Sequence, residues 1–313
     1  MSGAPTIGRV VVAGGSGAVG SLFAERLAES GNDVVIVDRE IPGPTHRVTR
    51  FVRGDISDPG AEVADVVRTA DAVLLCVPEP VALVAIGRLV GTLRPDALIA
   101  DTLSVKSTVV PALHAAAVIA GEAEALSLNP MFAPSLGFAG HPVASVIVRD
   151  GQRGRALADL IEQWGARVVN VTADQHDRVA AAAQALTHAA VIAFGAALTE
   201  LDVDIADLDR MGPPPHTALL SLLARIASGA PEVYWDVQAA NPYAPAARRA
   251  LSRGVSQLAD VIEDGNSAAF GDLLDRLCGV FGPLRGAYRE RSARGLRAMT
   301  TSLTTNLVKE SLG

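Results

Sequence analysis

The chain has 313 residues, a formal net charge of −7 and 49% hydrophobic residues, and this length allows two domains of about 100–200 residues each. The acidic balance, without any cluster of Lys and Arg, excludes the usual nucleic-acid binder. A mean hydropathy of +0.30 does not indicate a membrane protein, because no apolar stretch runs unbroken for the roughly 20 residues that a spanning helix needs, so the expected partner is a small molecule.

The first hundred residues alternate β-branched runs with helix-like stretches. Near-continuous apolar strands such as Asp71–Val77 suit a parallel sheet that is covered on both faces, where strict alternation is not required. We therefore predict an α/β fold with a doubly wound parallel sheet, a Rossmann-type domain. The elements behind this prediction are, in chain order, Val10–Ala13, Val19–Ser30, Val34–Asp38, Ala72–Val77 and Ala97–Asp101.

The character of the sequence changes at Thr172. Before it, two strand-like runs, Ala144–Arg149 and Arg167–Val171, flank a predicted helix over Arg153–Trp164 and are assigned to the same sheet. After it the β-branched runs vanish, and the helical pattern is broken at residues 212–215 and 241–242. We predict a Rossmann domain over residues 1–172 and an all-helical domain over residues 173–313.

The second domain carries more apolar surface than a single small bundle hides. Its richest stretch, residues 180–198, is interrupted by polar side chains and is interpreted as a buried helix. We expect a symmetric homodimer through this domain, because a second copy is the simplest cover for such helices.

A glycine-rich loop, GSGAVG at residues 15–20, follows the first predicted strand and opens a helix. This is the context in which the motif binds the pyrophosphate of a dinucleotide, with Gly15 at the tight turn, Gly17 where backbone approaches the phosphate and Gly20 where helix packs on strand. Asp38 ends the second strand, where a carboxylate accepts from ribose hydroxyls and repels a 2′-phosphate, which favours NAD over NADP. We expect cofactor contacts from Gly15, Ser16, Gly17, Val19, Gly20, Asp38, Arg39, Val77 and Pro78.

Two further segments follow predicted strands. The segment Cys76–Pro80 is interpreted as the cofactor floor, with a plain strand-ending turn as the alternative that also explains its two prolines. The segment Asp101–Lys106 opens the next helix at the carboxyl edge of the sheet, where ligands bind. Ser104 is there either the N-cap of that helix, a residue in contact with substrate, or both.

These segments, together with later ones, resemble the prephenate/arogenate dehydrogenase family over nearly the whole chain. The resemblance implies an NAD-dependent oxidoreductase that removes a hydride from C4 of a cyclohexadiene, with loss of the ring carboxylate and aromatisation. It rests on Asp101, Ser104, Val105 and Lys106, on Asn129–Phe132, on Gln175–Asp177, on Gln184–His188, and on Arg225, Pro231, Trp235 and Asn241.

The resemblance also implies roles for single residues. Arg225 is expected to hold a substrate carboxylate, for which a guanidinium fork is well shaped. Ser104 is expected to face the C4 substituent, and Trp235 to form part of the pocket wall. His188 has either a direct role in the site or a place in the core. His216 stands near the position of a basic residue in the family and is expected to contact the substrate side chain.

One departure from the family lies at residue 129. The family has a histidine before Pro130-Met131 that takes the proton of the C4 hydroxyl, whereas this chain has Asn129. A carboxamide forms hydrogen bonds but accepts no proton, and the loss of a general base costs roughly 10²–10⁴-fold in rate. An amino group at C4 needs no strong base, because its lone pair expels hydride better than a neutral alcohol does.

Three functions therefore stay open. The first is oxidation of 4-amino-4-deoxyprephenate to 4-aminophenylpyruvate in specialised metabolism, with Ser104, Asn129 and His188 at the catalytic centre. The second is a prephenate or arogenate dehydrogenase in which His141, His188 or His216 replaces the missing base. The third is a dinucleotide-binding homologue without catalysis.

The ends of the chain and its cysteines add two expectations. The first residues lack the basic start and apolar run of a signal peptide, so a cytoplasmic protein is expected. Cys76 and Cys278 are each isolated in apolar segments, so we expect core positions and no metal site. The last residues follow an amphipathic helix directly, and no regulatory module is expected after them.

Overall fold

The computed structural model describes residues 7–41, 50–121 and 123–310, with side chains up to residue 299. The chain forms two compact units. The sheet unit comprises Met1–Ala181 and Trp235–Tyr243, and the helical unit comprises Ala182–Tyr234 and Ala244–Gly313. Helix α6 (Ala173–Ala180) begins at the predicted domain boundary, and the sheet unit continues to the end of that helix.

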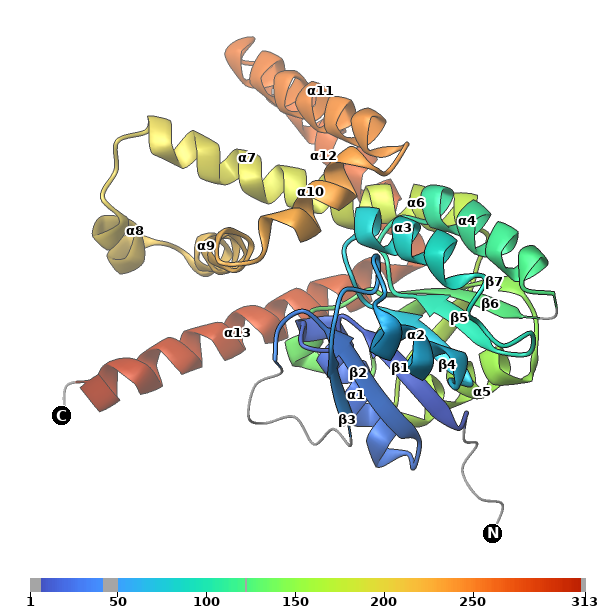
Figure 1. Cartoon of the computed structure of the whole chain (residues 1–313). Coiled ribbons are helices and arrows are strands. Elements are labelled where there is room, and N and C mark those ends of the chain that lie inside the picture. Colours follow the sequence, from blue (N-terminus) through green and yellow to red (C-terminus); the bar gives the residue numbers. More distant parts are fainter. Residues whose placement is uncertain (1–6, 42–49, 122, 311–313) are drawn as a thin grey trace. The chain divides into compact units, whose positions relative to one another are not determined.

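The sheet unit is built on eight strands in the order β3-β2-β1-β4-β5-β6-β7-β8 (Figure 1). The six strands from β3 to β6 pair in parallel, β7 runs antiparallel to β6, and β8 is parallel to β7. The predicted doubly wound, mainly parallel sheet is confirmed. Its strands are β1 (Arg9–Ala13), β2 (Asp33–Asp38), β3 (Arg50–Arg53), β4 (Ala72–Leu75), β5 (Leu98–Asp101), β6 (Glu124–Pro130), β7 (Pro142–Arg149) and β8 (Arg167–Asn170).

Helices cover both faces of this sheet, which is why its strands are apolar on both sides. One core contains buried side chains of α2, α3 and α4, and the other contains those of α1 and α5. A ring cluster closes the second core, where Phe23 and Phe138 lie edge-on at 5.1 Å between centroids. These helices are α1 (Ala18–Glu29), α2 (Ala61–Arg68), α3 (Glu79–Leu89), α4 (Lys106–Ile119) and α5 (Gln152–Gln163).

Two strands were missed by the sequence-based prediction, β3 and β6. The apolar pattern of β6 is interrupted by Ser127, and its first residue is a glutamate. Glu124 is nevertheless buried, because its carboxylate accepts hydrogen bonds from the backbone N–H groups of Arg153 (3.1 Å) and Gly154 (2.7 Å) at the start of α5. The missed strand β6 delivers Asn129 to the carboxyl edge of the sheet.

The helical unit contains only helices and turns within its described residues, as predicted. Two of its breaks fall at the predicted prolines, since α8 ends at Met211 and α11 begins at Ala244 after Asn241-Pro242. Further breaks at residues 201–204, 228–230 and 264–266 were not predicted. Beyond a π-helical turn (Ala181–Ala185), the helices are α7 (Leu186–Glu200), α8 (Ile205–Met211), α9 (Pro214–Ala227), α10 (Pro231–Ala239, which ends in the sheet unit), α11 (Ala244–Glu263), α12 (Ser267–Phe281) and α13 (Arg285–Glu310).

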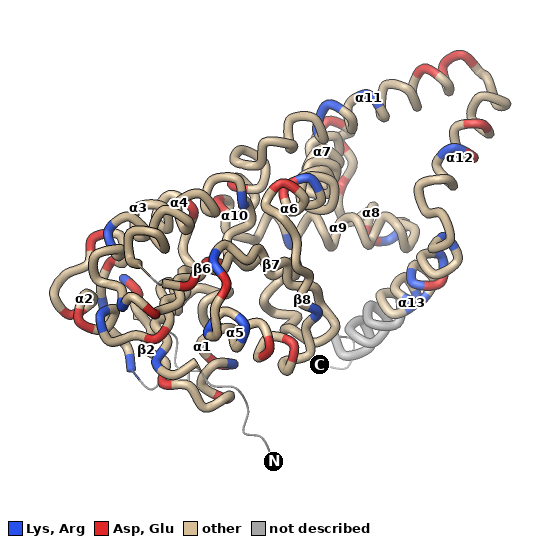
Figure 2. The backbone as a smooth tube through the Cα atoms, turned by 90° about the vertical axis from the view of Figure 1, so that its right-hand side faces the viewer, with Lys and Arg blue, Asp and Glu red and all other residues tan. Residues whose placement is uncertain are grey.

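Little of the helical unit is buried within one chain. In α7 only Val191 and Gly195 are buried, so the prediction of a buried helix over residues 180–198 is wrong for the single chain. By length and composition, residues 173–200 are apolar enough to cross a membrane, but a single such helix is weak evidence for this, because core helices of soluble proteins pass the same test. The sequence of α7 contains one charged residue, Glu200, whereas charged residues recur along α11 and α12 (Figure 2).

Candidate functional site

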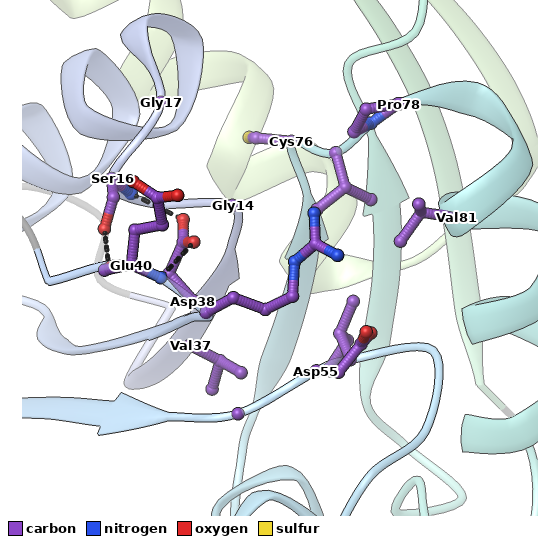
Figure 3. Close-up of a pocket in the computed structure, with 14 residues that line it drawn as sticks. Gly14, Ser16, Gly17, Val37, Asp38, Glu40, Asp55, Cys76, Pro78 and Val81 are labelled. Atoms are coloured by element: carbon purple, nitrogen blue, oxygen red, sulfur yellow. Dashed lines mark hydrogen bonds between the residues drawn. The ribbon is translucent and has the colours of Figure 1, made fainter.

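The glycine-rich loop and the ends of β2 and β4 enclose a cavity of about 320 Å³ (Figure 3). Helix α1 begins directly after Gly17, which brings no side-chain cap, so the first N–H groups of the helix are available to an anion. The cavity is therefore suited to a dinucleotide. Of the predicted cofactor contacts, Ser16, Gly17, Asp38, Arg39, Val77 and Pro78 line it, and Gly14 joins them.

The glycines of this loop have structural roles that differ in part from the predicted ones. Gly14, not Gly15, has the positive φ of the tight turn (77°). A Cβ on Gly15 would lie 2.7 Å from the Ile36 side chain, so Gly15 is needed for packing on β2. A Cβ on Gly20 would lie 2.2 Å from the Gly14 carbonyl oxygen, so at Gly20 the helix packs closely on the loop that follows β1.

Asp38 connects the end of β2 to the glycine-rich loop. One carboxylate oxygen accepts from the Ser16 N–H at 3.0 Å, and the other accepts from the Glu40 N–H at 3.1 Å. The Ser16 hydroxyl in turn donates to the Glu40 carbonyl at 2.7 Å. These bonds fix the carboxylate at the cavity wall, where each oxygen keeps a lone pair for a ribose hydroxyl.

The segment after β4 forms another wall of the same cavity, with Cys76, Val77 and Pro78. Burial, together with the Asp101 carboxylate, raises the pKa of the Cys76 thiol to about 12 against an opposing hydrogen bond from Thr102. The thiol is therefore unreactive at neutral pH. The prediction of a cofactor floor agrees with this position.

A buried ion pair holds the next strand end. Lys106 and Asp101 are both 0% exposed, with 3.1 Å between Nζ and Oδ1. The Lys106 ammonium also donates to the carbonyls of Leu103 and Leu128, each at 2.7 Å. Burial lowers the pKa of Lys106, although Asp101 opposes this. Through these bonds one cation joins the loop after β5 to the end of β6, next to Asn129.

Ser104 is not the N-cap of α4, so that interpretation is wrong. The N-cap residue is Val105, and no side chain of its own caps the helix. The Asp177 carboxylate of α6 does so instead, since it accepts from the N–H groups of Lys106 (2.9 Å) and Ser107 (2.8 Å). Ser104 therefore lies at the sheet edge with its hydroxyl not committed to the helix.

Asn129 contacts an imidazole. Its Nδ2 lies 3.0 Å from His176 Nε2 and 3.2 Å from Met131 Sδ, while His176 Nδ1 lies 2.8 Å from Asp177 Oδ1. All three polar residues are buried. Burial opposes a charge on Asp177, but hydrogen bonds from His176 and from two backbone N–H groups hold its pKa below the ordinary value.

Glu79 is a further titratable group at this edge, in the first turn of α3. Burial, with the negative charges of Asp236, Asp177 and Asp101, raises its pKa, and a hydrogen bond with Thr108 opposes the shift. Within the described residues, no group of three or more His, Cys, Asp or Glu side chains could hold a metal ion.

The predicted residues His188, His216 and Arg225 lie in the helical unit. The His188 ring meets Tyr234 edge-on at 5.0 Å between centroids, and burial, followed by the charge of Arg225, lowers its pKa. Three buried polar atoms have no hydrogen-bond partner among the described residues of this unit: Gln184 Oε1, His188 Nδ1 and His216 Nε2. Gln184 belongs to the π-helical turn and His188 follows it by three residues, and such turns are frequent at functional sites, whereas the His216 ring lies beside Phe194 of α7.

Trp235 and Asn241 belong to the short C-terminal segment of the sheet unit. Trp235 is 69% exposed and is not a core residue. Asn241 is buried, donates to the Asp177 carbonyl at 2.9 Å and accepts from the Tyr243 N–H at 2.9 Å. Asn241 thus anchors this segment to α6, close to the His176–Asp177 pair.

Within the sheet unit, the structure brings Ser104 and Asn129 to neighbouring strand ends, because Asp101 of β5 pairs with Ser127 of β6. The sequence-based site lacked Gly14, Lys106, His176 and Asp177. The last three lie in motifs that carried the family resemblance, but no local pattern gave them a role. The histidine that contacts Asn129 is none of the three considered as substitute bases.

Comparisons with known proteins agree with this geometry. Residues 172–276 match the dimerization domain of prephenate dehydrogenase, and residues 10–110 match the NAD dependent epimerase/dehydratase family. A 4-amino-4-deoxyprephenate dehydrogenase from Streptomyces pristinaespiralis is 51% identical over 93% of this chain and 97% of its own length. A probable arogenate/prephenate dehydrogenase from Methanocaldococcus jannaschii is 24% identical over 94% of this chain and 66% of its own.

Among solved structures, prephenate dehydrogenase from A. aeolicus, in complex with hydroxyphenyl propionate and NAD+, matches with a TM-score of 0.69 and 20% identity. The match covers 86% of this chain and 96% of that one. At this identity the likeness concerns the fold, which is shared over almost the whole of that protein.

Proposed function

The chain belongs to the prephenate dehydrogenase family, and from this premise we propose that it oxidises 4-amino-4-deoxyprephenate to 4-aminophenylpyruvate with NAD. The observation that carries the choice of substrate is Asn129 at the end of β6, where the family resemblance expects a histidine. A relative that is 51% identical acts, by its name, on the same amino compound.

The reaction balances without a base at C4. The C4–H bond breaks, and its electron pair leaves as hydride while the nitrogen lone pair forms a C=N bond. The bond from C1 to the ring carboxylate then breaks, CO₂ departs, and the released electrons make the ring aromatic and return the lone pair to nitrogen. NAD, when bound, accepts the hydride. At neutral pH the amine enters as an ammonium, and water takes its third proton before hydride transfer. The neutral amino group then keeps its two remaining N–H bonds to the product, so the carboxamide of Asn129 does not have to accept a proton.

NAD, rather than NADP, fits the described cavity. The Asp38 carboxylate is held at its wall by Ser16 and Glu40, and a fixed negative charge there repels a 2′-phosphate. Gly17 at the start of α1 leaves the helix N-terminus open to the pyrophosphate.

Residues outside this cavity enter as proposals drawn from the sequence. Ser104 faces the C4 substituent, Arg225 holds a substrate carboxylate, and His188, His216 and Trp235 contribute to the substrate site. The guanidinium of Arg225 has no carboxylate partner among the described residues, in keeping with an external anion. We further propose that residues 1–172 bind NAD and residues 173–313 serve substrate binding and dimerisation, that the chain forms a homodimer through the helical unit, and that it is a cytoplasmic enzyme without a metal.

The decisive experiment compares substrates with purified protein and NAD. We expect kcat/KM for 4-amino-4-deoxyprephenate to exceed that for prephenate and for arogenate by about 10²-fold or more, the lower end of what a missing base costs. Comparable rates on prephenate would refute the proposal.

The variant Asn129→His sharpens this test, because it restores a proton acceptor. It should raise kcat/KM for prephenate by at least about ten-fold, part of the general-base contribution, and give no gain with the amino substrate. Asn129→Gln is the matched control, since it changes length but adds no base and should not improve prephenate. If Asn129→His changed kcat/KM equally for both substrates, Asn129 would not determine the choice of substrate.

A further inference from the structure

We propose that His176 and Asp177 form a positioning pair that fixes the orientation of the Asn129 carboxamide, so that its oxygen faces the substrate nitrogen. The starting point is a series of three buried side chains from two elements far apart in sequence. Asn129 ends β6, while His176 and Asp177 lie on α6. The inference rests on the proposed function, because it takes an amino group as the partner of that oxygen.

The protons of this series can be assigned from its fixed end. The Asp177 carboxylate also accepts from the N–H groups of Lys106 and Ser107 and stays ionised, so it can only accept. Because Asp177 accepts at 2.8 Å, His176 Nδ1 must carry the hydrogen. In the neutral ring Nε2 then presents a lone pair, and the atom 3.0 Å from it must be a donor.

The carboxamide has one donor group and one acceptor atom, so this assignment settles both. The Nδ2 group points one N–H toward His176 Nε2 and approaches Met131 Sδ at 3.2 Å with the other. The oxygen, Oδ1, accepts no hydrogen bond from any side chain or backbone in the described part of the chain, and it is not among the fully buried polar atoms. Oδ1 is thus the atom of Asn129 left for a ligand.

An acceptor in this place suits nitrogen at C4. As hydride leaves, the nitrogen lone pair is drawn into the C=N bond and the N–H groups become more positive, so a hydrogen bond from N–H to Oδ1 strengthens toward the transition state. Interactions that strengthen in this way accelerate the reaction. If the carboxamide turned over, its Nδ2 hydrogens would oppose the N–H groups of the substrate.

The first test is spectroscopic and needs no substrate. Long-range ¹H–¹⁵N NMR of the full-length protein labelled with ¹⁵N-histidine reports which ring nitrogen carries hydrogen, and the signal missing from the His176→Gln protein identifies His176. We expect the Nδ1–H tautomer with an unprotonated Nε2. An Nε2–H tautomer or a ring protonated at both nitrogens would overturn the inference, because Nε2 would then be a donor.

The second test is kinetic. His176→Leu removes the acceptor at similar volume, and His176→Gln places an oxygen near the position of Nε2. We expect His176→Leu to lower the ratio of kcat/KM for the amino substrate to that for prephenate by about ten-fold, the scale of one misplaced hydrogen bond. His176→Gln should recover part of that ratio. An equal loss on both substrates would show a merely structural role.

The two proposals fail in different ways. Wild-type protein that prefers prephenate refutes the proposed function, whatever the tautomer of His176. A preference for the amino substrate combined with an Nε2–H tautomer, or with an unchanged ratio in His176→Leu, refutes only the positioning pair. If His176→Leu does not fold by circular dichroism, the tautomer in the wild-type protein decides the question.

Discussion

The two units differ in how much of their apolar surface a single chain buries. The sheet unit buries apolar side chains in two cores, one on each face of its sheet. Among the described residues of the helical unit, the only buried hydrophobic side chains are Ala185, Val191 and Ala244. The sheet unit therefore buries its own apolar side chains, whereas the helical unit leaves most of its apolar side chains exposed and matches a dimerization domain, which supports the proposed second copy.

The largest expected effect comes from substitutions of exposed apolar side chains in the helical unit. Leu277 on α12 and Leu258 on α11 are 49% and 45% exposed. Either leucine replaced by Asp should weaken the dimer by roughly 10²-fold or more, because each leucine buried in a symmetric interface occurs twice and contributes about 1.5–3 kcal/mol per copy. Light scattering coupled to gel filtration measures the mass.

Asp275→Lys is the control for this prediction, since it changes an exposed charge on the same helix. It should leave the mass unchanged. Wild-type protein that is monomeric at micromolar concentration, or dimers that tolerate both leucine substitutions, would contradict the comparison of the two units.

The next largest effect concerns the buried ion pair between Lys106 and Asp101 in the sheet unit. Lys106→Met leaves the buried Asp101 carboxylate without its cation, and the free energy of unfolding should fall by about 3–5 kcal/mol. Urea titration followed by circular dichroism measures the loss. The double variant Asp101→Asn/Lys106→Met removes the unpaired charge and should recover part of it. A loss below about 1 kcal/mol would mean that the pair stabilises little.

The same contrast explains what the sequence predicts and what it does not. Six of the eight strands, the glycine-rich loop and Asp38 follow from local patterns, and the structure contains them. Asp177 caps α4 from 71 residues away, as its bond to Lys106 shows, and no periodicity reports such a contact. The exchange of roles between Gly14 and Gly15 depends on the Ile36 side chain of the neighbouring strand. Sequence patterns give elements, whereas long-range polar contacts require the fold.

The smallest expected effect concerns Glu79 of the sheet unit, whose ionised carboxylate destabilises the folded state. Burial raises the pKa of Glu79 above its ordinary value of 4.5, and Asp236, Asp177 and Asp101 add to the shift. The folded protein therefore holds this proton more tightly than the unfolded chain, so the stability contributed by this group falls as pH rises from 4.5 through the folded pKa. Glu79→Gln mimics the protonated form and should remove that loss.

We expect Glu79→Gln to leave the Tm unchanged below pH 4.5 and to raise it slightly at pH 7. The gain in the free energy of unfolding at pH 7 should be well under about 1 kcal/mol, because the side chain is only half-buried. Differential scanning calorimetry of both proteins without cofactor measures the difference at each pH, and effects common to both cancel. Glu62→Gln on the exposed surface of α2 is the control and should show no such trend. A Tm difference that does not change with pH would contradict this prediction, because it would show that the ionised Glu79 carboxylate does not destabilise the folded sheet unit.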